Sequence, residues 1–340
     1  MVAMFLFCQL LIKQVTKTKS IAIFTLAAVL FYAVVRYTYR EVDMAHLINQ
    51  ISGNDLIGLL GLGLLFHLSF GLIMWVGFIL HYKLRLKTIE ILTLPLMMHL
   101  FLYLMPIKGG MLFHVFYSKH KYGLDLSKGF SIGLMVFLNS IFLTVILGLG
   151  LAYYIPIESP ELLLTILAMG VGLVGMMITM NFLPSARRSG NSVIVSLINF
   201  LINVRVQLAG QFMNIKLFFG LLITTFISVT IQAILFWKTA SILDIQSDFL
   251  AVYLVVLILR VLLLIRLLPG NLGIQELIIG VVFAAAGFQL EDGLLIGVVT
   301  RLISVFWSAF IGLPALYSNL KYFDSISISE LINKVSKSDK

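Results

Sequence analysis

The chain has 340 residues, of which 60% are hydrophobic and only 11% are charged, and its mean hydropathy is +1.06. A soluble domain carries about a quarter charged residues, so this composition excludes an ordinary soluble protein and indicates an integral membrane protein. The formal net charge of +9 is typical of basic cytoplasmic loops. Since no dense basic run with interleaved aromatic residues occurs, we expect no nucleic-acid partner.

The N-terminus, MVAMFLFCQL, lacks a basic segment before its apolar stretch and has no clear cleavage site. We therefore predict that residues 1–19 are retained and form an N-terminal interfacial segment. The single cysteine, Cys8, rules out an intrachain disulfide and a cysteine-based metal site. The histidines are scattered without the spacing of metal ligands, so we expect no metal and no cofactor.

Apolar runs long enough to cross a hydrocarbon core of about 30 Å recur along the chain. They lack the alternating pattern of barrel strands, so the sequence predicts an all-α polytopic membrane protein. Residues 189–213 mix apolar and polar side chains, which is typical either of a helix along the membrane interface or of an ordinary connecting helix. The predicted spans are 20–38, 55–80, 88–118, 129–155, 161–183, 216–237, 250–288 and 293–318.

Basic residues set the predicted orientation. Lysines precede the first span, and basic residues follow the second span, the segment 88–118, the fifth span and the last, whereas the remaining loops are acidic. This pattern predicts cytoplasmic N- and C-termini, a cytoplasmic tail over 321–340, and a bacterial or archaeal inner membrane. It also places both ends of 88–118 on the cytoplasmic side and both ends of 250–288 outside. These two segments are therefore predicted to be re-entrant hairpins, and the chain is predicted to have about six full spans in addition to them.

The two hairpin tips share a short motif. One tip reads YLMPIKGGMLFH and the other RLLPGNLGIQEL, and both fit Pro-x-(Lys/Asn)-x-Gly. Span, hairpin and span occur twice, which predicts a first repeat over 20–155 and a second, inverted repeat over 156–320. Inverted repeats with broken helices are a recurrent transporter architecture, with the binding site near the midplane. The predicted tip residues are Pro106, Gly109, Gly110, Pro269, Gly270 and Gly273.

Several charged and polar residues fall inside predicted spans. At 1.5 Å per residue, Arg260 lies about 15 Å and Arg301 about 12 Å from the outer side. Intramembrane charges cost about 2.5–3.5 kcal/mol each, so they should be paired or face water. Either the arginines line a cavity for an anionic headgroup, or an Arg–Glu pair locks the hairpin, which is the favoured role of Glu276. The predicted substrate-binding residues are Arg260, Arg301, Arg266, Glu276, Asn271, Gln275 and Lys108.

The motif Pro269-Gly270-x-x-Gly273-x-x-Glu276, followed by Arg301 in the next span, resembles the flippase-like lysylphosphatidylglycerol synthase transmembrane family. This family forms the membrane half of the multiple peptide resistance factor proteins and also occurs as stand-alone proteins. The resemblance covers nearly the whole chain. The first tip of the family usually reads Pro-x-Arg-x-Gly-acidic, whereas Lys108 and Met111 replace the arginine and the acidic residue in this sequence.

The resemblance implies a function in membrane lipid translocation. No soluble aminoacyl-transferase domain is evident, and no phosphate-binding loop or nucleophile elbow occurs, so we predict no catalytic residue. The expected partners are a lipid with an anionic or glycolipid headgroup and a lipid-modifying enzyme. Two alternatives remain open at the level of sequence. One is a membrane-embedded transferase of lipid-linked sugars or headgroups, and the other is a scaffold for a partner lipid synthase.

Overall fold

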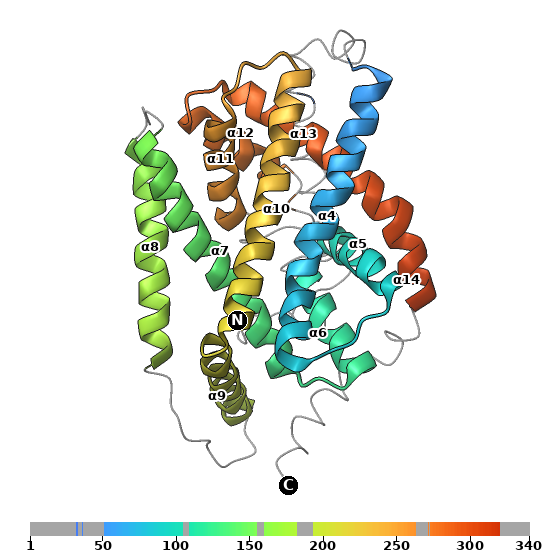
Figure 1. Cartoon of the computed structure of the whole chain (residues 1–340), viewed down its shortest axis with the longest axis vertical. Helices are drawn as coiled ribbons and strands as arrows, with labels where there is room; N and C mark the ends of the chain where they lie inside the picture. Colours follow the sequence, from blue (N-terminus) through green and yellow to red (C-terminus); the bar gives the residue numbers. More distant parts are fainter. Residues whose placement is uncertain are drawn as a thin grey trace.

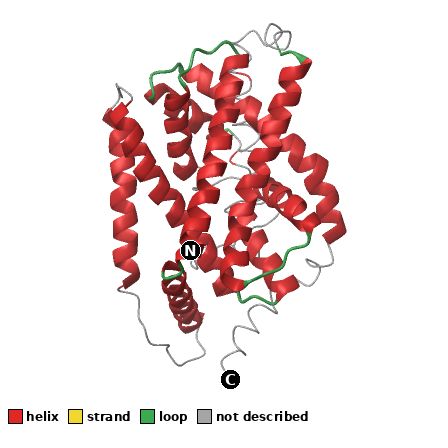
Figure 2. Cartoon of the chain, viewed as in Figure 1, coloured by secondary structure: helices red, strands yellow, loops and turns green. Residues whose placement is uncertain are grey.

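The computed structural model describes residues 51–104, 109–154, 160–181, 193–262, 271 and 273–319, together with Tyr32 and Arg36. Every regular element in these ranges is a helix (Figure 2), which confirms the predicted all-α polytopic fold. The predicted interfacial segment 1–19, nearly all of the first span and the tail 321–340 lie outside the described residues.

The long helices coincide with predicted spans. They are α4 (Gly53–Tyr82), α7 (Leu126–Tyr154), α10 (Ile215–Ile242) and the continuous segment Leu290–Asn319. Each is long and apolar enough to cross a membrane. The last segment consists of α13 (Leu290–Trp307), a π-helical turn over Ser308–Gly312 and α14 (Leu313–Asn319). The π-helical turn is a feature that the sequence analysis did not predict.

The ends of α4 are set by local backbone chemistry. The Ser52 hydroxyl accepts a hydrogen bond from the Asp55 amide, which caps the N-terminus. The helix ends where Lys83 adopts a left-handed conformation with φ of 54° and its amide binds the Phe78 carbonyl. Asp55 also forms an ion pair of 3.5 Å with Lys238, which joins this end of α4 to α10. The two helices lie side by side (Figure 1).

The two segments predicted to be interrupted each form a pair of shorter helices. The first segment contains α5 (Thr88–Leu104) and α6 (Gly109–Tyr122), and the second contains α11 (Phe249–Leu262) and α12 (Ile274–Ala285). The helices of each pair pack against each other, with α5 and α6 in the lower half of the molecule and α11 and α12 in the upper half (Figure 1). Pro106 and Pro269, where the breaks are predicted, lie outside the described residues.

Two further helices flank this core. Helix α8 (Pro160–Asn181) packs against α7, and α9 (Val193–Phe212) lies at the lower end against α7 and α10 (Figure 1). Gln211 on α9 donates a hydrogen bond of 2.7 Å to Ser131 on α7, and the Tyr82 hydroxyl on α4 donates to Gln207. Part of the polar surface of α9 therefore bonds to neighbouring helices, and its position at a membrane interface stays a prediction.

Helices α12 and α13 pack closely at a pair of glycines. A Cβ atom added to Gly293 would lie 2.7 Å from the Gly280 Cα atom and 2.7 Å from the Phe283 Cβ atom. Both of these neighbouring atoms are fixed by the α12 backbone. A side chain at this position would push the two helices apart, so the glycine is required for their close approach.

We expect the substitution Gly293→Val to destabilise the folded protein by about 1–3 kcal/mol, because it overpacks this contact. Thermal unfolding of the purified protein in detergent, followed by tryptophan fluorescence, measures the effect. Gly172→Val on α8 is the matched control, since an added Cβ there meets no atom within 4 Å. Equal stability of the two variants would show that the α12–α13 contact tolerates a side chain.

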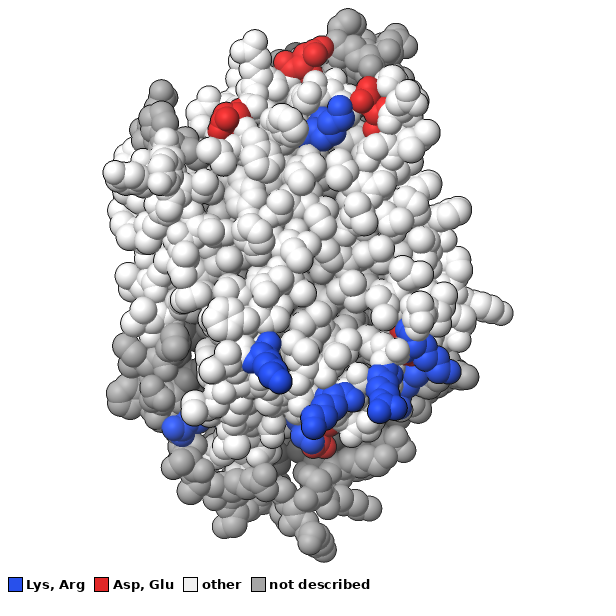
Figure 3. Space-filling view, viewed as in Figure 1, with Lys and Arg blue, Asp and Glu red and all other residues white. Residues whose placement is uncertain are grey.

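Charged side chains gather at the two ends of the visible face. Figure 3 shows acidic groups mainly at the upper end, basic groups mainly at the lower end, and a broad uncharged band between them. The loop with Lys83, Arg85 and Lys87 joins α4 to α5 at the lower end, and the loop with Asp244 and Asp248 follows α10 at the upper end. This separation is the charge pattern of a protein that spans a membrane.

Candidate functional site: a buried polar centre with two arginines

The start of α12 has the backbone that its sequence predicts. Gly273 has φ of 78°, in the left-handed region that glycine adopts at no steric cost. Three residues later, the Glu276 carboxylate accepts a hydrogen bond of 2.8 Å from the Gly273 amide. This bond satisfies one of the free amides at the helix N-terminus, and the negative charge complements the helix dipole. The carboxylate is thereby held at a fixed position in the protein interior.

Glu276 forms a buried ion pair with Arg301 on α13. The Arg301 Nε atom donates to Glu276 Oε1 at 2.5 Å, and the two residues are 2% and 0% exposed. The Arg301 Nη2 atom also donates to the Gln275 side chain at 3.1 Å and to the Asn271 carbonyl at 3.4 Å. Arg301 therefore connects α13 to the chain on both sides of the Gly273 turn. This geometry fits the hypothesis of an Arg–Glu pair that locks the hairpin.

Arg260 on α11 has different surroundings. Its Nη2 atom donates to the Ser228 hydroxyl on α10 at 3.3 Å, and its guanidinium lies 4.3 Å from the centre of the Phe70 ring on α4. The residue is only 5% exposed. A cation over an aromatic face is stabilised by the ring quadrupole. This contact stabilises the guanidinium without neutralising it, because a ring carries no net negative charge.

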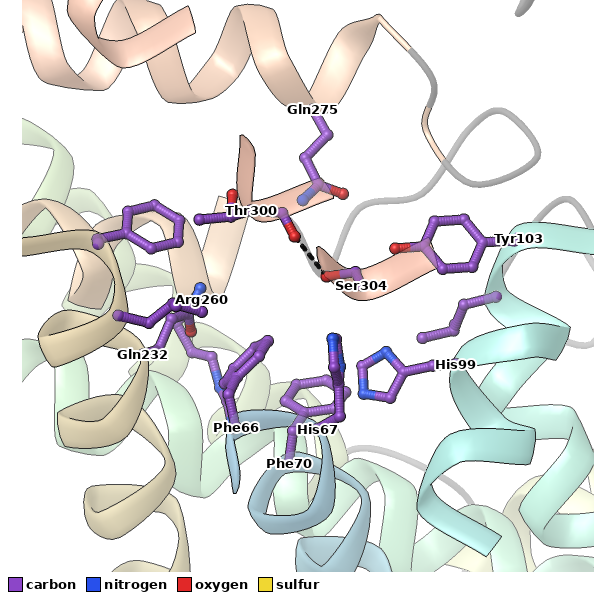
Figure 4. A pocket seen from close by; sticks show the side chains of 13 residues that line it. Phe66, His67, Phe70, His99, Tyr103, Gln232, Arg260, Gln275, Thr300 and Ser304 are labelled. Carbon is purple, nitrogen blue, oxygen red and sulfur yellow. Dashed lines mark hydrogen bonds between the residues drawn. The ribbon is translucent and has the colours of Figure 1, made fainter. Parts of the chain in front are cut away.

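A cavity of about 80 Å³ lies beside Arg260 (Figure 4). Six helices, α4, α5, α10, α11, α12 and α13, contribute its walls, which combine aromatic side chains with amides, hydroxyls and histidines. Among the residues that line it in the described part of the chain, Arg260 is the permanently charged side chain, and none is a carboxylate. The cavity is large enough for several water molecules and presents a positive charge to whatever enters it.

The structure brings together most of the site residues predicted on the second repeat. Gln275 lines the cavity and touches Arg301, which in turn contacts Glu276 and the Asn271 carbonyl. Arg260 lines the same cavity from α11. At the first tip, Gly109 and Gly110 begin α6. Arg266, Lys108, Pro106, Pro269 and Gly270 lie outside the residues that the structure describes.

Sequence reasoning missed several cavity residues. His67 on α4, His99 and Tyr103 on α5 and Gln232 on α10 all line the cavity. None of these four is among the predicted site residues, most of which lie around the two tips. The available signal was their chemistry, because ionisable residues inside a membrane span are rare and mark functional sites. The sequence does not show, however, which of them face a common space.

A second buried carboxylate, Glu90 on α5, was also missed. It accepts hydrogen bonds from the hydroxyls of Tyr117 and Tyr122 at 3.0 and 2.7 Å, from the Lys87 amide, and from Lys121, with which it forms an ion pair. Since four donors satisfy this carboxylate, it has the character of a structural connection between α5 and α6. It does not line the cavity.

The helices, the buried charges and the cavity together define a polytopic membrane protein with a cationic polar centre. The family model described as the lysylphosphatidylglycerol synthase TM region matches residues 20–312. The chain belongs to the lysylphosphatidylglycerol synthase transmembrane family, and its function is therefore related to membrane lipid. Comparison with curated proteins and with solved structures finds no match.

Proposed function

We propose that the protein moves a lipid with an anionic or modified headgroup, or a glycolipid, between the two leaflets, and that Arg260 binds the headgroup. The observation that carries the proposal is the position of Arg260 on the wall of a buried cavity to which no described residue contributes a carboxylate. Arg301, by contrast, is held outside the cavity by the carboxylate of Glu276 at 2.5 Å. A phosphate or carboxylate that enters the cavity would meet the Arg260 guanidinium, whose planar fork can bind two oxygens at once.

The remaining predicted residues take supporting positions in this proposal. Gln275 would contact the headgroup from α12 while Arg301 holds its amide, and Glu276 would keep Arg301 in place. Asn271 would contribute through its backbone, which already accepts a bond from Arg301. The tips would bring Lys108 and Arg266 toward the same centre and increase its attraction for an anion.

The arrangement of the broken helices supports the proposed architecture. In this architecture, 88–118 and 250–288 are re-entrant hairpins within two inverted repeats, 20–155 and 156–320. The helices of the first pair lie in the lower half of the molecule and those of the second pair in the upper half (Figure 1), as two hairpins entering from opposite sides would. The basic lower end would face the cytoplasm, with both termini.

The size of the cavity has a consequence for transport. A volume of about 80 Å³ holds several waters. In this proposal the helices around the cavity move apart to admit a whole headgroup.

The direct test uses vesicles that contain the purified full chain and a fluorescent phosphatidylglycerol. In vesicles without protein, a membrane-impermeant quencher removes the signal of the outer leaflet alone. We expect the protein to make the inner pool accessible as well, with the lipid chemically unchanged. A labelled lipid whose mass changes in the presence of a sugar or headgroup donor would instead favour the transferase. Unchanged vesicles together with co-purification of a lipid synthase would favour the scaffold.

A further inference from the structure

Two histidines lie in contact inside the cavity. His67 on α4 and His99 on α5 have ring centres 4.1 Å apart and ring planes at 73°, and both line the cavity (Figure 4). His67 is 1% exposed. Neither of its ring nitrogens has a hydrogen-bond partner within the described residues. A buried polar side chain normally has a partner, so the position of His67 points to something that enters the cavity and bonds to it.

The charged and titratable groups around this pair are few. Arg260 faces the cavity from α11, and Tyr103 faces it from α5 next to His99. The groups contributed by α10, α12 and α13 are neutral amides, hydroxyls and apolar side chains. Arg301 lies 5.4 Å from the Tyr103 ring, and Glu276 neutralises it. Among the cavity groups of the described chain, the histidines are therefore the ones whose unperturbed pKa lies closest to neutral pH.

In this cavity, binding of an anion favours binding of a proton to the histidines. Without an anion, a proton on either histidine would add a second positive charge to the cavity that Arg260 lines, and like charges repel. A negative headgroup placed between Arg260 and the histidines would attract both positive charges. A second proton would place two imidazolium rings 4.1 Å apart, which like-charge repulsion disfavours.

We propose that the cavity takes up its anionic headgroup together with one proton, and that the His67–His99 pair carries this proton. The inference rests on the proposed function for the identity of the anion, a lipid phosphodiester. The balance of charge is simple. A phosphodiester carries one negative charge and the proton one positive charge, while Arg260 stays with the protein. Lipid and proton would cross with no net charge, so a pH gradient would drive the movement and the membrane potential would not.

Binding of dihexanoyl phosphatidylglycerol to the purified full chain in detergent tests this inference. Its phosphodiester stays singly charged between about pH 5.5 and about pH 8, the range in which histidine titrates. Since binding takes up a proton, affinity is highest at low pH. We expect it to fall with rising pH by up to about tenfold per pH unit, the limit for one linked proton. Calorimetry in two buffers of different ionisation enthalpy should record the uptake directly.

Variants of the histidines show whether the pH dependence of binding comes from His67 and His99 or from other groups. The double variant His67→Gln/His99→Gln keeps polar side chains of similar size and should bind with an affinity independent of pH. His120→Gln is the matched control, because His120 lies on α6 outside the cavity and bonds to its own helix. It should keep the wild-type pH dependence.

Each outcome distinguishes this inference from the proposed function. Wild-type binding with no pH dependence and no proton uptake would overturn the inference and leave the lipid function standing. A double variant that keeps the slope would overturn the role of the histidines. If the double variant does not fold, the calorimetric proton count on the wild type decides. Absence of binding at every pH would count against the proposed function itself and would overturn the inference with it.

Discussion

The variant Glu276→Ala is expected to destabilise the folded protein by about 3–5 kcal/mol, because it removes one partner of a fully buried ion pair and leaves the buried Arg301 charge without this carboxylate. The Glu276 carboxylate also accepts the bond from the Gly273 amide. Its loss therefore loosens the turn at the start of α12 as well. Thermal unfolding of the purified protein in detergent, followed by tryptophan fluorescence, measures the effect.

Two further variants show whether the lost charge compensation is the cause. The double variant Arg301→Met/Glu276→Met removes both charges and should recover most of the lost stability, since apolar replacement of a buried pair is often neutral. Asp125→Ala is the control, because it breaks a pair of 3.5 Å with Lys128 at an exposed position. An exposed pair contributes at most about 1 kcal/mol. A Glu276→Ala protein as stable as the control would contradict a structural role for the pair.

The sequence was sufficient to predict the turn at Gly273 and, as one of two alternatives, an Arg–Glu pair beside it. A helix breaker and a carboxylate inside an apolar segment are both unfavourable in lipid, so each required a polar partner or a special backbone. Glycine with positive φ and glutamate at the start of the next helix are local features, fixed by residues three positions apart. The long helices were predictable for a similar reason, because uninterrupted apolar runs alone set their lengths.

The cavity was not predictable from the same signals. It is formed by six helices from two distant parts of the chain, α4 and α5 in one and α10 to α13 in the other. Helix α4 carries apolar side chains on all of its faces, because in a membrane both the lipid-facing side and the side that packs on other helices are apolar. Hydrophobic periodicity therefore does not show that His67 points inward. Likewise, the ion pair of Glu90 with Lys121 joins two helices of one hairpin, and a local pattern contains no information on that pairing.

The substitution Arg260→Ala is expected to weaken binding of dihexanoyl phosphatidylglycerol by about 10–100-fold, with little loss of stability. Contacts to charged groups contribute about 1.5–3 kcal/mol, and each 1.4 kcal/mol corresponds to about tenfold in affinity. Stability should change little because the hydroxyl and the ring that Arg260 contacts, those of Ser228 and Phe70, are uncharged groups. Binding and thermal unfolding are measured on the same purified protein.

Three companion variants make the result specific for the guanidinium group and its position. Arg260→Lys keeps the charge but loses the planar fork that binds two phosphate oxygens, so its affinity should be intermediate. Arg85→Ala removes an exposed charge in the loop between α4 and α5 and should bind as the wild type does. Arg301→Ala should lose stability first, because it leaves the Glu276 carboxylate buried without this partner. If instead Arg301→Ala stays folded and loses binding while Arg260→Ala binds normally, the headgroup site lies at the α12–α13 pair and the roles of the two arginines are reversed.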